Sequence, residues 1–446
     1  MNAGQFLKGL ISKVAAPADP ARGASRRARE VVGLCHALMS ERGEVSGAAI
    51  ARDLLAAYAA LPANAHTAFL QLLAEEFSPD AAAIARTAAE FAKEQSPQHL
   101  IDLQHAVESP RQELFRRLNV APGATAVLVN IRRRLLRELK SNPQLIAVDA
   151  DLAHLFGSWF NRGFLKLERI DWRTPAIVLE KLIAYEAVHE IAGWTDLRRR
   201  LAADRRCFGF FHPALPDEPL IFIEVALTNR ISDAVAPLLD QESAVADPAH
   251  ADSAIFYSIT NCQEGLRGIS FGNLLIKQVA AEISREFPRL KHFATLSPIP
   301  GVRAWLDSRS KDNDGVAALL PALKNHDWHK DADTVAAMRE KLMPLCAHYL
   351  LRAKKDNAPL DAVSRFHLGN GARLERLNWL ADVSASGMQR SAGMMVNYVY
   401  RLDEVEANHE AFVRDGSVAT SHAIKKLARD CSLPAVQNAV KDRRTN

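Results

Sequence analysis

The hydrophobic pattern of this 446-residue chain changes its period once, near residue 160. Before that point, over about 26–160, apolar residues recur at helical spacing, as at Leu70 and Leu73. After it, short β-rich apolar runs alternate with turn-forming segments and with further helical stretches. This order predicts an α-helical bundle over 1–160, followed by an α+β or α/β catalytic domain over 161–446.

Seven or eight helices are expected in the first region, because start signals punctuate it. Ser78-Pro79-Asp80 and Ser109-Pro110 each have the form of an N-cap followed by a proline at the first helical position. The basic run Arg132-Arg133-Arg134 is most simply a solvated helix face, and a contact to a phosphate or a partner is the alternative.

The second region contains several runs that predict strands, with His212 to Pro219 as a turn between the first two. The polar stretch 240–252 is typical of a surface loop, and a long helix is expected over about 272–287. The expected strands cover 207–211, 220–227, 254–260, 292–296, 374–383 and 394–400.

Composition narrows the class of protein. Lys plus Arg number 56 against 52 Asp plus Glu, so the net charge of +4 argues against nucleic-acid binding by bulk charge. The five cysteines are scattered without zinc-site spacing, which suits reduced thiols.

No apolar run reaches the roughly 18 residues of a membrane span. Met1 to Val14 is amphipathic but lacks the pattern of a signal peptide. We therefore expect a cytoplasmic protein.

The segment from Ala254 to the helix that opens near Gly272 has the features of an anion cradle. It combines a strand, a loop with glycines at Gly265, Gly268 and Gly272, and a helix N-terminus. Glycines let the backbone approach a phosphate, and the exposed N–H groups and the helix dipole favour negative charge. The spacing matches neither a dinucleotide fingerprint nor a P-loop, so an ordinary turn before a helix remains an alternative.

Two further motifs carry candidate catalytic side chains. In Leu296-Ser297-Pro298-Ile299-Pro300-Gly301 the prolines stiffen a turn and fix the direction of Ser297 at a strand end. In Phe366-His367-Leu368-Gly369-Asn370-Gly371, His367 lies in an expected loop between a helix and a strand, and its imidazole can exchange protons near neutral pH. A capping serine and a structural loop histidine are the alternatives. His212 and Glu224 flank the first turn, where a structural role is the simpler interpretation.

Taken together and in order, these segments resemble the malonyl-CoA decarboxylase family. The resemblance runs from about Phe156 to Tyr400 and also includes Asn378-Trp379-Leu380-Ala381-Asp382-Val383-Ser384 and Asn397-Tyr398-Val399-Tyr400. It implies a helical domain that assembles a homo-oligomer, a dimer or tetramer, and an acetyltransferase-like (GNAT) α/β domain that binds coenzyme A. It implies conversion of malonyl-CoA to acetyl-CoA and CO2, in fatty acid metabolism.

The resemblance also assigns roles to residues. Ser297 and His367 match the family's catalytic serine and histidine. The loop that binds the acyl-CoA matches Arg267, Gly268, Ile269, Ser270, Phe271, Gly272 and Asn273. Some relatives have a glutamate where this chain has Ser270, so we predict no catalytic carboxylate. Ser258 is a secondary candidate for lining the site, and Lys277 and Arg303 are weaker candidates for meeting CoA phosphates. The thioester is itself an electron sink, so no metal or other cofactor is expected.

Two other functions fit parts of the sequence. A cradle of this kind also suits an acyltransferase, in which an amine attacks a bound acetyl-CoA. A catalytically silent CoA-binding or scaffolding protein built on the helical bundle is the alternative from a different class. Retention of both Ser297 and His367 argues against the silent protein, and the decarboxylase-like segments outside the cradle argue against the acyltransferase.

Overall fold

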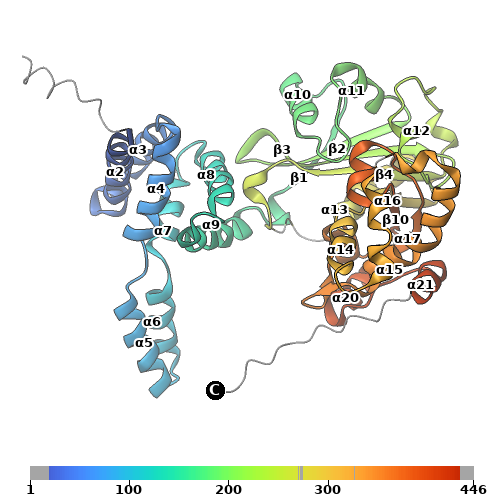
Figure 1. The fold of residues 1–446 in the computed structure, drawn as a ribbon. Helices are drawn as coiled ribbons and strands as arrows, with labels where there is room; N and C mark the ends of the chain where they lie inside the picture. Colours follow the sequence, from blue (N-terminus) through green and yellow to red (C-terminus); the bar gives the residue numbers. More distant parts are fainter. Residues whose placement is uncertain (1–19, 270, 272–274, 326, 432–446) are drawn as a thin grey trace, which may run out of the picture. The chain divides into compact units, whose positions relative to one another are not determined.

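The structure is a computed structural model that describes residues 20–269, 271, 275–325 and 327–431. The chain divides into two compact units (Figure 1). The first comprises the chain up to Phe164 together with two later segments, His212–Pro216 and Gln263–Phe271, and the second comprises the remainder. Within the described residues, no helix is long and apolar enough to cross a membrane. The amphipathic stretch from Met1 to Val14 lies outside them.

The first unit is helical, as its sequence pattern predicts. Its described part contains eight α-helices and three short 3-10 turns. The α-helices are α2 (Pro20–Met39), α3 (Glu41–Ala59), α4 (Ala63–Glu76), α5 (Ala81–Lys93), α6 (Pro97–Val107), α7 (Pro110–Leu118), α8 (Ala124–Glu138) and α9 (Ile146–Trp159). The turns are η1 (Pro143–Leu145), η2 (Arg162–Phe164) and, from the second of the later segments, η4 (Glu264–Leu266).

One expected helix start is confirmed and the other is wrong. Ser109 caps α7 by accepting from the Arg111 amide, with Pro110 at the first helical position. At the start of α5 the cap is Asp80, whose carboxylate accepts from the Ala82 amide, and Ser78 instead donates to the Ala74 carbonyl at the end of the preceding helix. Asp80 adjoins the helix and its negative charge favours the helix N-terminus, so it serves as the cap in place of Ser78.

A buried ion pair ties three of these helices together. Arg111 of α7 is 2% exposed, and its Nε lies 2.8 Å from Asp151 Oδ2 of α9. Its Nη1 donates to the Ala74 carbonyl of α4 and to Ser78 Oγ. Gln112 donates to the second carboxylate oxygen of Asp151. Because both Asp151 oxygens and two guanidinium nitrogens of Arg111 have partners, hydrogen bonds across the bundle offset part of the cost of burying the two charges.

The second unit is built on one mixed sheet with the strand order β1-β2-β3-β4-β5-β10-β6, and β9 pairs with β10. The pairs β1–β2, β3–β4, β5–β10, β6–β10 and β9–β10 are antiparallel, and β4–β5 is parallel. The strands are β1 (Lys166–Ile170), β2 (Arg205–His212), β3 (Leu215–Thr228), β4 (Ser253–Asn261), β5 (His292–Thr295), β6 (Ser297–Pro298), β9 (Arg373–Asn378) and β10 (Met395–Val399). A separate two-stranded sheet pairs β7 (Lys354–Lys355) with β8 (Ala358–Pro359).

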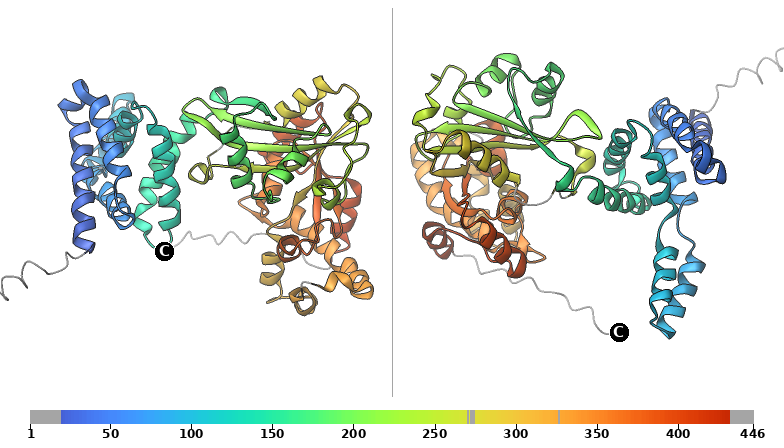
Figure 2. Two further views of the ribbon diagram at one scale, coloured as in Figure 1. Left: turned by 90° about the horizontal axis from the view of Figure 1, so that it is seen from above. Right: turned by 180° about the vertical axis from the view of Figure 1, so that it is seen from behind.

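Helices lie on both sides of the sheet (Figures 1 and 2). Side chains of α10 and α11 pack with Cys207 and Phe222 on one face. The main helices are α10 (Ala176–Tyr185), α11 (Trp194–Arg200), α12 (Ala236–Leu239), α13 (Leu275–Glu286), α14 (Val302–Arg309), α17 (Ala332–Arg352), α18 (Ala362–Gly369), α19 (Ala385–Ser391), α20 (Val405–Asp415) and α21 (His422–Arg429). Shorter turns are η3 (Pro248–His250), α15 (Asp314–Ala317), α16 (Leu320–Lys324) and η5 (Trp328–Lys330).

The order of a helical region followed by an α/β region is thus confirmed, and all six expected strands are found. The turn expected from His212 to Pro219 is wrong in extent, because β3 begins at Leu215 and runs through two prolines. The left-handed φ of +56° at Asp217 accommodates this irregular stretch. The strand expected to reach 383 ends at Asn378, because Leu380 has a φ of +48° and cannot continue a strand.

The buried pair of α7 and α9 gives a stability prediction. We expect Arg111→Ala to lower the free energy of unfolding by about 3 kcal/mol or more, because Asp151 then keeps a buried charge with one partner fewer. Urea unfolding followed by circular dichroism measures the change. Arg116→Ala on the same helix is the matched control, and it should cost about 1 kcal/mol or less, because that side chain is 40% exposed. Equal losses from the two variants would contradict the prediction.

Candidate active site

Ser297 and His367 lie side by side in the interior of the second unit. Ser297 is the first residue of β6, and its Oγ is 3.0 Å from Nε2 of His367 in α18. Both residues are buried, at 6% and 3% exposure. The two motifs, 70 residues apart in the sequence, therefore supply one hydroxyl–imidazole pair, a combination that can bind and move a proton.

Two neighbouring strands complete the hydrogen bonds of this pair. Ser297 Oγ donates to Thr295 Oγ1 over 2.9 Å, and the same threonine oxygen accepts from the Tyr398 amide. Nδ1 of His367 lies 2.8 Å from the Tyr400 hydroxyl. With the serine proton directed to Thr295, the consistent arrangement has His367 Nε2–H donating to Ser297 and the tyrosine donating to Nδ1.

The imidazole of His367 sits in an apolar, aromatic environment. Its ring stacks on Tyr398 with centroids 4.6 Å apart and an interplanar angle of 25°. Burial lowers the pKa of His367 from 6.5 to about 3, since a charged ring would lose its hydration without a compensating anion. At neutral pH the ring is therefore uncharged before a substrate arrives.

The last turn of α18, and not a loop as expected, carries His367. The helix begins at the N-cap Asp361, whose Oδ1 accepts from the Ser364 amide. The other carboxylate oxygen accepts from the Gly301 amide at 3.4 Å and from the Tyr349 hydroxyl at 3.5 Å. A Cβ at position 301 would lie 2.2 Å from the Tyr349 oxygen, so a larger residue there would displace that hydroxyl. The turn after Ser297 and the helix bearing His367 are thus joined through one carboxylate.

The expected acyl-CoA loop is described in part. Arg267 and Gly268 are exposed, Ile269 is partly buried and Phe271 is buried. Gly268 has a φ of +82°, in the region that glycine favours. The expected contacts of Ser270, Gly272 and Asn273 lie outside the described residues.

A helix of the first unit supports this loop. Arg132 of α8 is 4% exposed and donates through Nη1 to the main-chain carbonyls of Gly265 and Arg267. The interpretation of the basic run as a solvated face is therefore wrong for Arg132. The helical period places one residue of a three-residue run on the buried side, and charge alone does not reveal which.

The structure does not bring Ser258 to the serine–histidine pair. Its buried Oγ donates to both carboxylate oxygens of Glu186, at 2.9 and 2.8 Å, in the loop after α10. Glu224, on the neighbouring strand, is paired with Arg200 of α11 at 2.9 Å, and burial raises its pKa to about 7. Both side chains therefore belong to a polar network beneath α10 and α11.

The remaining candidates have structural partners. His212 Nε2 donates to the Trp159 carbonyl, and its Nδ1 accepts from the Ala214 amide, so its structural interpretation is confirmed. Lys277 forms an ion pair with Glu406, and Arg303 donates to the Leu323 carbonyl.

Thr295, Tyr398 and Tyr400 contact the pair, and none of the three is among the candidates that the sequence motifs indicate. The alternation of a strand over 394–400 could have revealed the two tyrosines, since residues two apart share a face.

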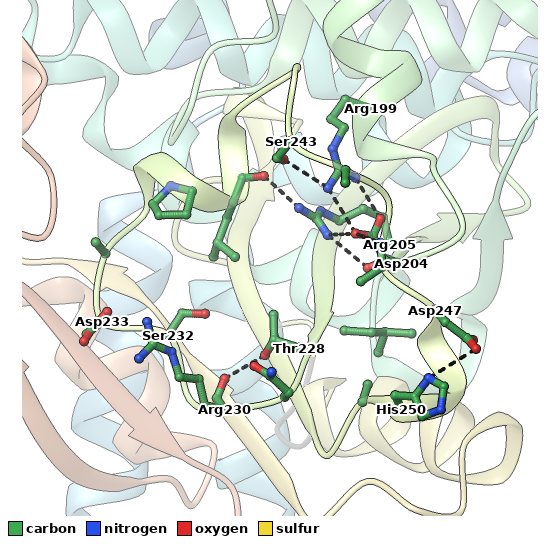
Figure 3. A pocket seen from close by; sticks show the side chains of 18 residues that line it. Arg199, Asp204, Arg205, Thr228, Arg230, Ser232, Asp233, Ser243, Asp247 and His250 are labelled. Carbon is green, nitrogen blue, oxygen red and sulfur yellow. Dashed lines mark hydrogen bonds and ion pairs between the residues drawn. The ribbon is translucent and has the colours of Figure 1, made fainter.

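A separate depression lies at the C-terminal end of β3, and several of the charged side chains that line it are paired with one another (Figure 3). Arg199 and Arg205 share the carboxylate of Asp204, and Arg205 also donates to the Leu238 carbonyl. Its wall holds no hydroxyl–imidazole pair bonded as Ser297 and His367 are, so it is not the candidate active site.

Known proteins resemble this chain in both of its regions. The family model of the malonyl-CoA decarboxylase C-terminal domain matches residues 163–442, and that of the N-terminal domain matches 77–160. The mitochondrial malonyl-CoA decarboxylase of Anser anser anser is 35% identical over 406 residues, which cover 82% of this chain and 81% of that protein. That of Rattus norvegicus is 34% identical over 355 residues, covering 73% of this chain and 72% of that protein.

Solved structures agree. The crystal structure of malonyl-CoA decarboxylase from Rhodopseudomonas palustris is 51% identical, with a TM-score of 0.85, and the match covers 90% of this chain and 99% of that one. The enzyme from Cupriavidus metallidurans is 37% identical with a TM-score of 0.70, covering 91% and 100%. The resemblance seen in the motifs is therefore confirmed over nearly the whole length, and this chain belongs to the malonyl-CoA decarboxylase family.

Proposed function

We propose that Ser297 and His367 carry out the reaction that family membership assigns to this chain, the decarboxylation of malonyl-CoA to acetyl-CoA and CO2. The observation that carries the proposal is the 3.0 Å contact between Ser297 Oγ and His367 Nε2 in a buried, uncharged setting. The low dielectric of a buried, uncharged site strengthens hydrogen bonds to a negatively charged substrate group.

The chemistry requires few protein groups. Loss of CO2 leaves an electron pair that spreads from the α-carbon to the thioester oxygen, and the enzyme must stabilise this enolate and then protonate its carbon. The thioester accepts the electrons, so the reaction needs no metal or other cofactor, and we propose that none is used. The Ser297 hydroxyl and His367 Nε2–H, which bond to Thr295 and Ser297 before substrate binds, can turn to the developing oxyanion as donors.

The substrate itself can adjust the acidity of His367. A malonyl carboxylate close to the ring favours the imidazolium form, opposing the effect of burial on the pKa. The Tyr400 hydroxyl at Nδ1 fixes the ring while Nε2 faces Ser297. We therefore assign His367 the role of proton donor to the carbon, and Ser297 that of orienting the ring and binding the carboxylate or the thioester oxygen.

An acyltransferase would need an acceptor amine, whereas this reaction needs only a proton. Release of CO2 from malonyl-CoA without any acceptor therefore separates the two functions.

We also propose a cytoplasmic location and a role in fatty acid metabolism. The names of the curated relatives given above place them in mitochondria, so fractionation of the source cells is the test of the location.

We further propose that the helical region assembles two or more copies of the chain. Helices α5 and α6 lie together as a hairpin (Figures 1 and 2), and neither contains a buried residue. Leu100 and Val107 of α6, seven residues apart and so on one face, are 42% and 48% exposed. An apolar face of this kind is typical of a contact between subunits.

The catalytic pair is tested by removing each member. We expect Ser297→Ala and His367→Gln each to lower kcat by about 100-fold or more, as is common for a lost general acid or oxyanion donor. The measurement is acetyl-CoA formed from malonyl-CoA by the purified protein. Ser391→Ala and His348→Gln replace other buried residues of the same types and should retain near-native kcat. Native activity in His367→Gln would end the proposed assignment.

The buried neutral imidazole also predicts a pH dependence of stability. The unfolded state protonates His367 near pH 6.5 and the folded state only near pH 3, so stability is lost as the pH falls between these values. In His367→Gln, the slope of unfolding free energy against pH should be smaller by about 1.4 kcal/mol per unit over pH 6 to 4. Urea unfolding at several pH values measures it. An unchanged slope in His367→Gln would contradict the prediction.

The assembly proposal is tested by placing a charge on the hairpin. We expect Leu100→Glu to shift the protein to a smaller species in light scattering, because a carboxylate buried in an apolar contact is strongly unfavourable. Val120→Glu, at a residue that is 72% exposed elsewhere in the first unit, is the control and should keep the native mass. An unchanged mass for Leu100→Glu, or a monomeric native protein, would contradict the proposal.

A further inference from the structure

Helix α8 of the first unit is bonded directly to the backbone of the expected acyl-CoA loop. Nη1 of Arg132 lies 2.8 Å from the Gly265 oxygen and 3.0 Å from the Arg267 oxygen. Its Nε donates to Asp149 Oδ1 of α9 over 2.8 Å. This bond fixes the orientation of the guanidinium, whose Nη1 binds the loop. Charge-assisted bonds from a planar, buried guanidinium fix direction as well as distance.

The loop approaches α8 more closely than a side chain would allow. A Cβ at Gly265 would lie 2.0 Å from the Val129 carbonyl oxygen of α8. Beside this contact, Arg137 of the same helix forms an ion pair with Glu264. The glycine, predicted from the sequence to approach a phosphate, therefore serves the contact with the helix.

We infer that Arg132 is a positioning residue for substrate binding, and that α8 is thereby part of the acyl-CoA site. In a trans peptide the C=O and N–H point in opposite directions. Since Arg132 holds the Arg267 carbonyl, the amide of Gly268 is turned away from α8, as an anion-binding N–H must be. The groups it would serve are the phosphates of coenzyme A, which bind readily to backbone amides. The inference rests on the proposed function.

Kinetics with two substrates test the inference. We expect Arg132→Ala to raise KM for malonyl-CoA about tenfold with kcat within about twofold, the pattern of lost substrate binding. Malonyl-pantetheine, which lacks the nucleotide and its phosphates, should show no such rise. Arg133→Ala removes the same charge from the next, exposed residue of α8 and should leave both KM values unchanged. Arg132→Lys retains the charge but not the fork of donors, and should fall between Ala and the native protein.

A second variant guards against a failure of Arg132→Ala to fold. Gly265→Ala pushes the loop from α8 while leaving the ion pair of Arg132 with Asp149 intact, and it should raise KM for malonyl-CoA selectively in the same way. An unchanged KM in both variants, or an equal rise with both substrates, would overturn the inference while leaving the function intact. If the native protein releases no CO2, the proposed function fails, and calorimetry with CoA alone then decides: Arg132→Ala must weaken CoA binding about tenfold.

Discussion

The candidate site depends on the pairing of β10 with the strand segments that carry Ser297. Val399 lies opposite Ala294 of β5, and Val396 lies opposite Ser297 of β6. Between these points the side chain of Asn397 donates to the Thr295 carbonyl at 2.7 Å, which holds the break in the strand at Leu296. Strand alternation then turns Tyr398 and Tyr400 to the same face as Thr295 and Ser297. Slipping β10 by one residue would turn Tyr398 and Tyr400 to the opposite face and so remove both tyrosine contacts of the His367 ring.

The sheet also separates two kinds of polar environment. On the face covered by α10 and α11, buried charges are paired, as Arg200 is with Glu224. On the other face, burial is the dominant influence on His367, and its hydrogen-bond partners are neutral hydroxyls. A neutral site can bind an anionic thioester substrate without first displacing a resident anion. In the proposed reaction, the charge that develops would lie at low dielectric, where hydrogen-bond donors have their greatest effect.

The features of the fold and of the candidate site that could be predicted are those that depend on residues close together in the sequence. Ser297 and His367 were identified because each stands in a distinctive local motif, yet neither motif contains the contact between them. The position of Ser258 could not be read from its strand, because the register of β3 and β4 shifts between Glu224 and Val225 and alters which face a residue occupies. The burial of Arg132 depends on a loop more than 130 residues away, and no local pattern encodes such a partner.

The anchoring of the loop follows from the topology of the sheet. The parallel pairing of β4 with β5 demands a crossover, which consists of the segment after Asn261 and helix α13. A long connection leaving a sheet costs conformational entropy, and a disordered cradle would bind its ligand correspondingly weakly. Bonds from Arg132 to the main chain lower that cost before the ligand arrives. Residues 161–446 expressed alone would lack this anchor even if the sheet folded, so, on the inference drawn from Arg132, the helical region contributes preorganisation to substrate binding.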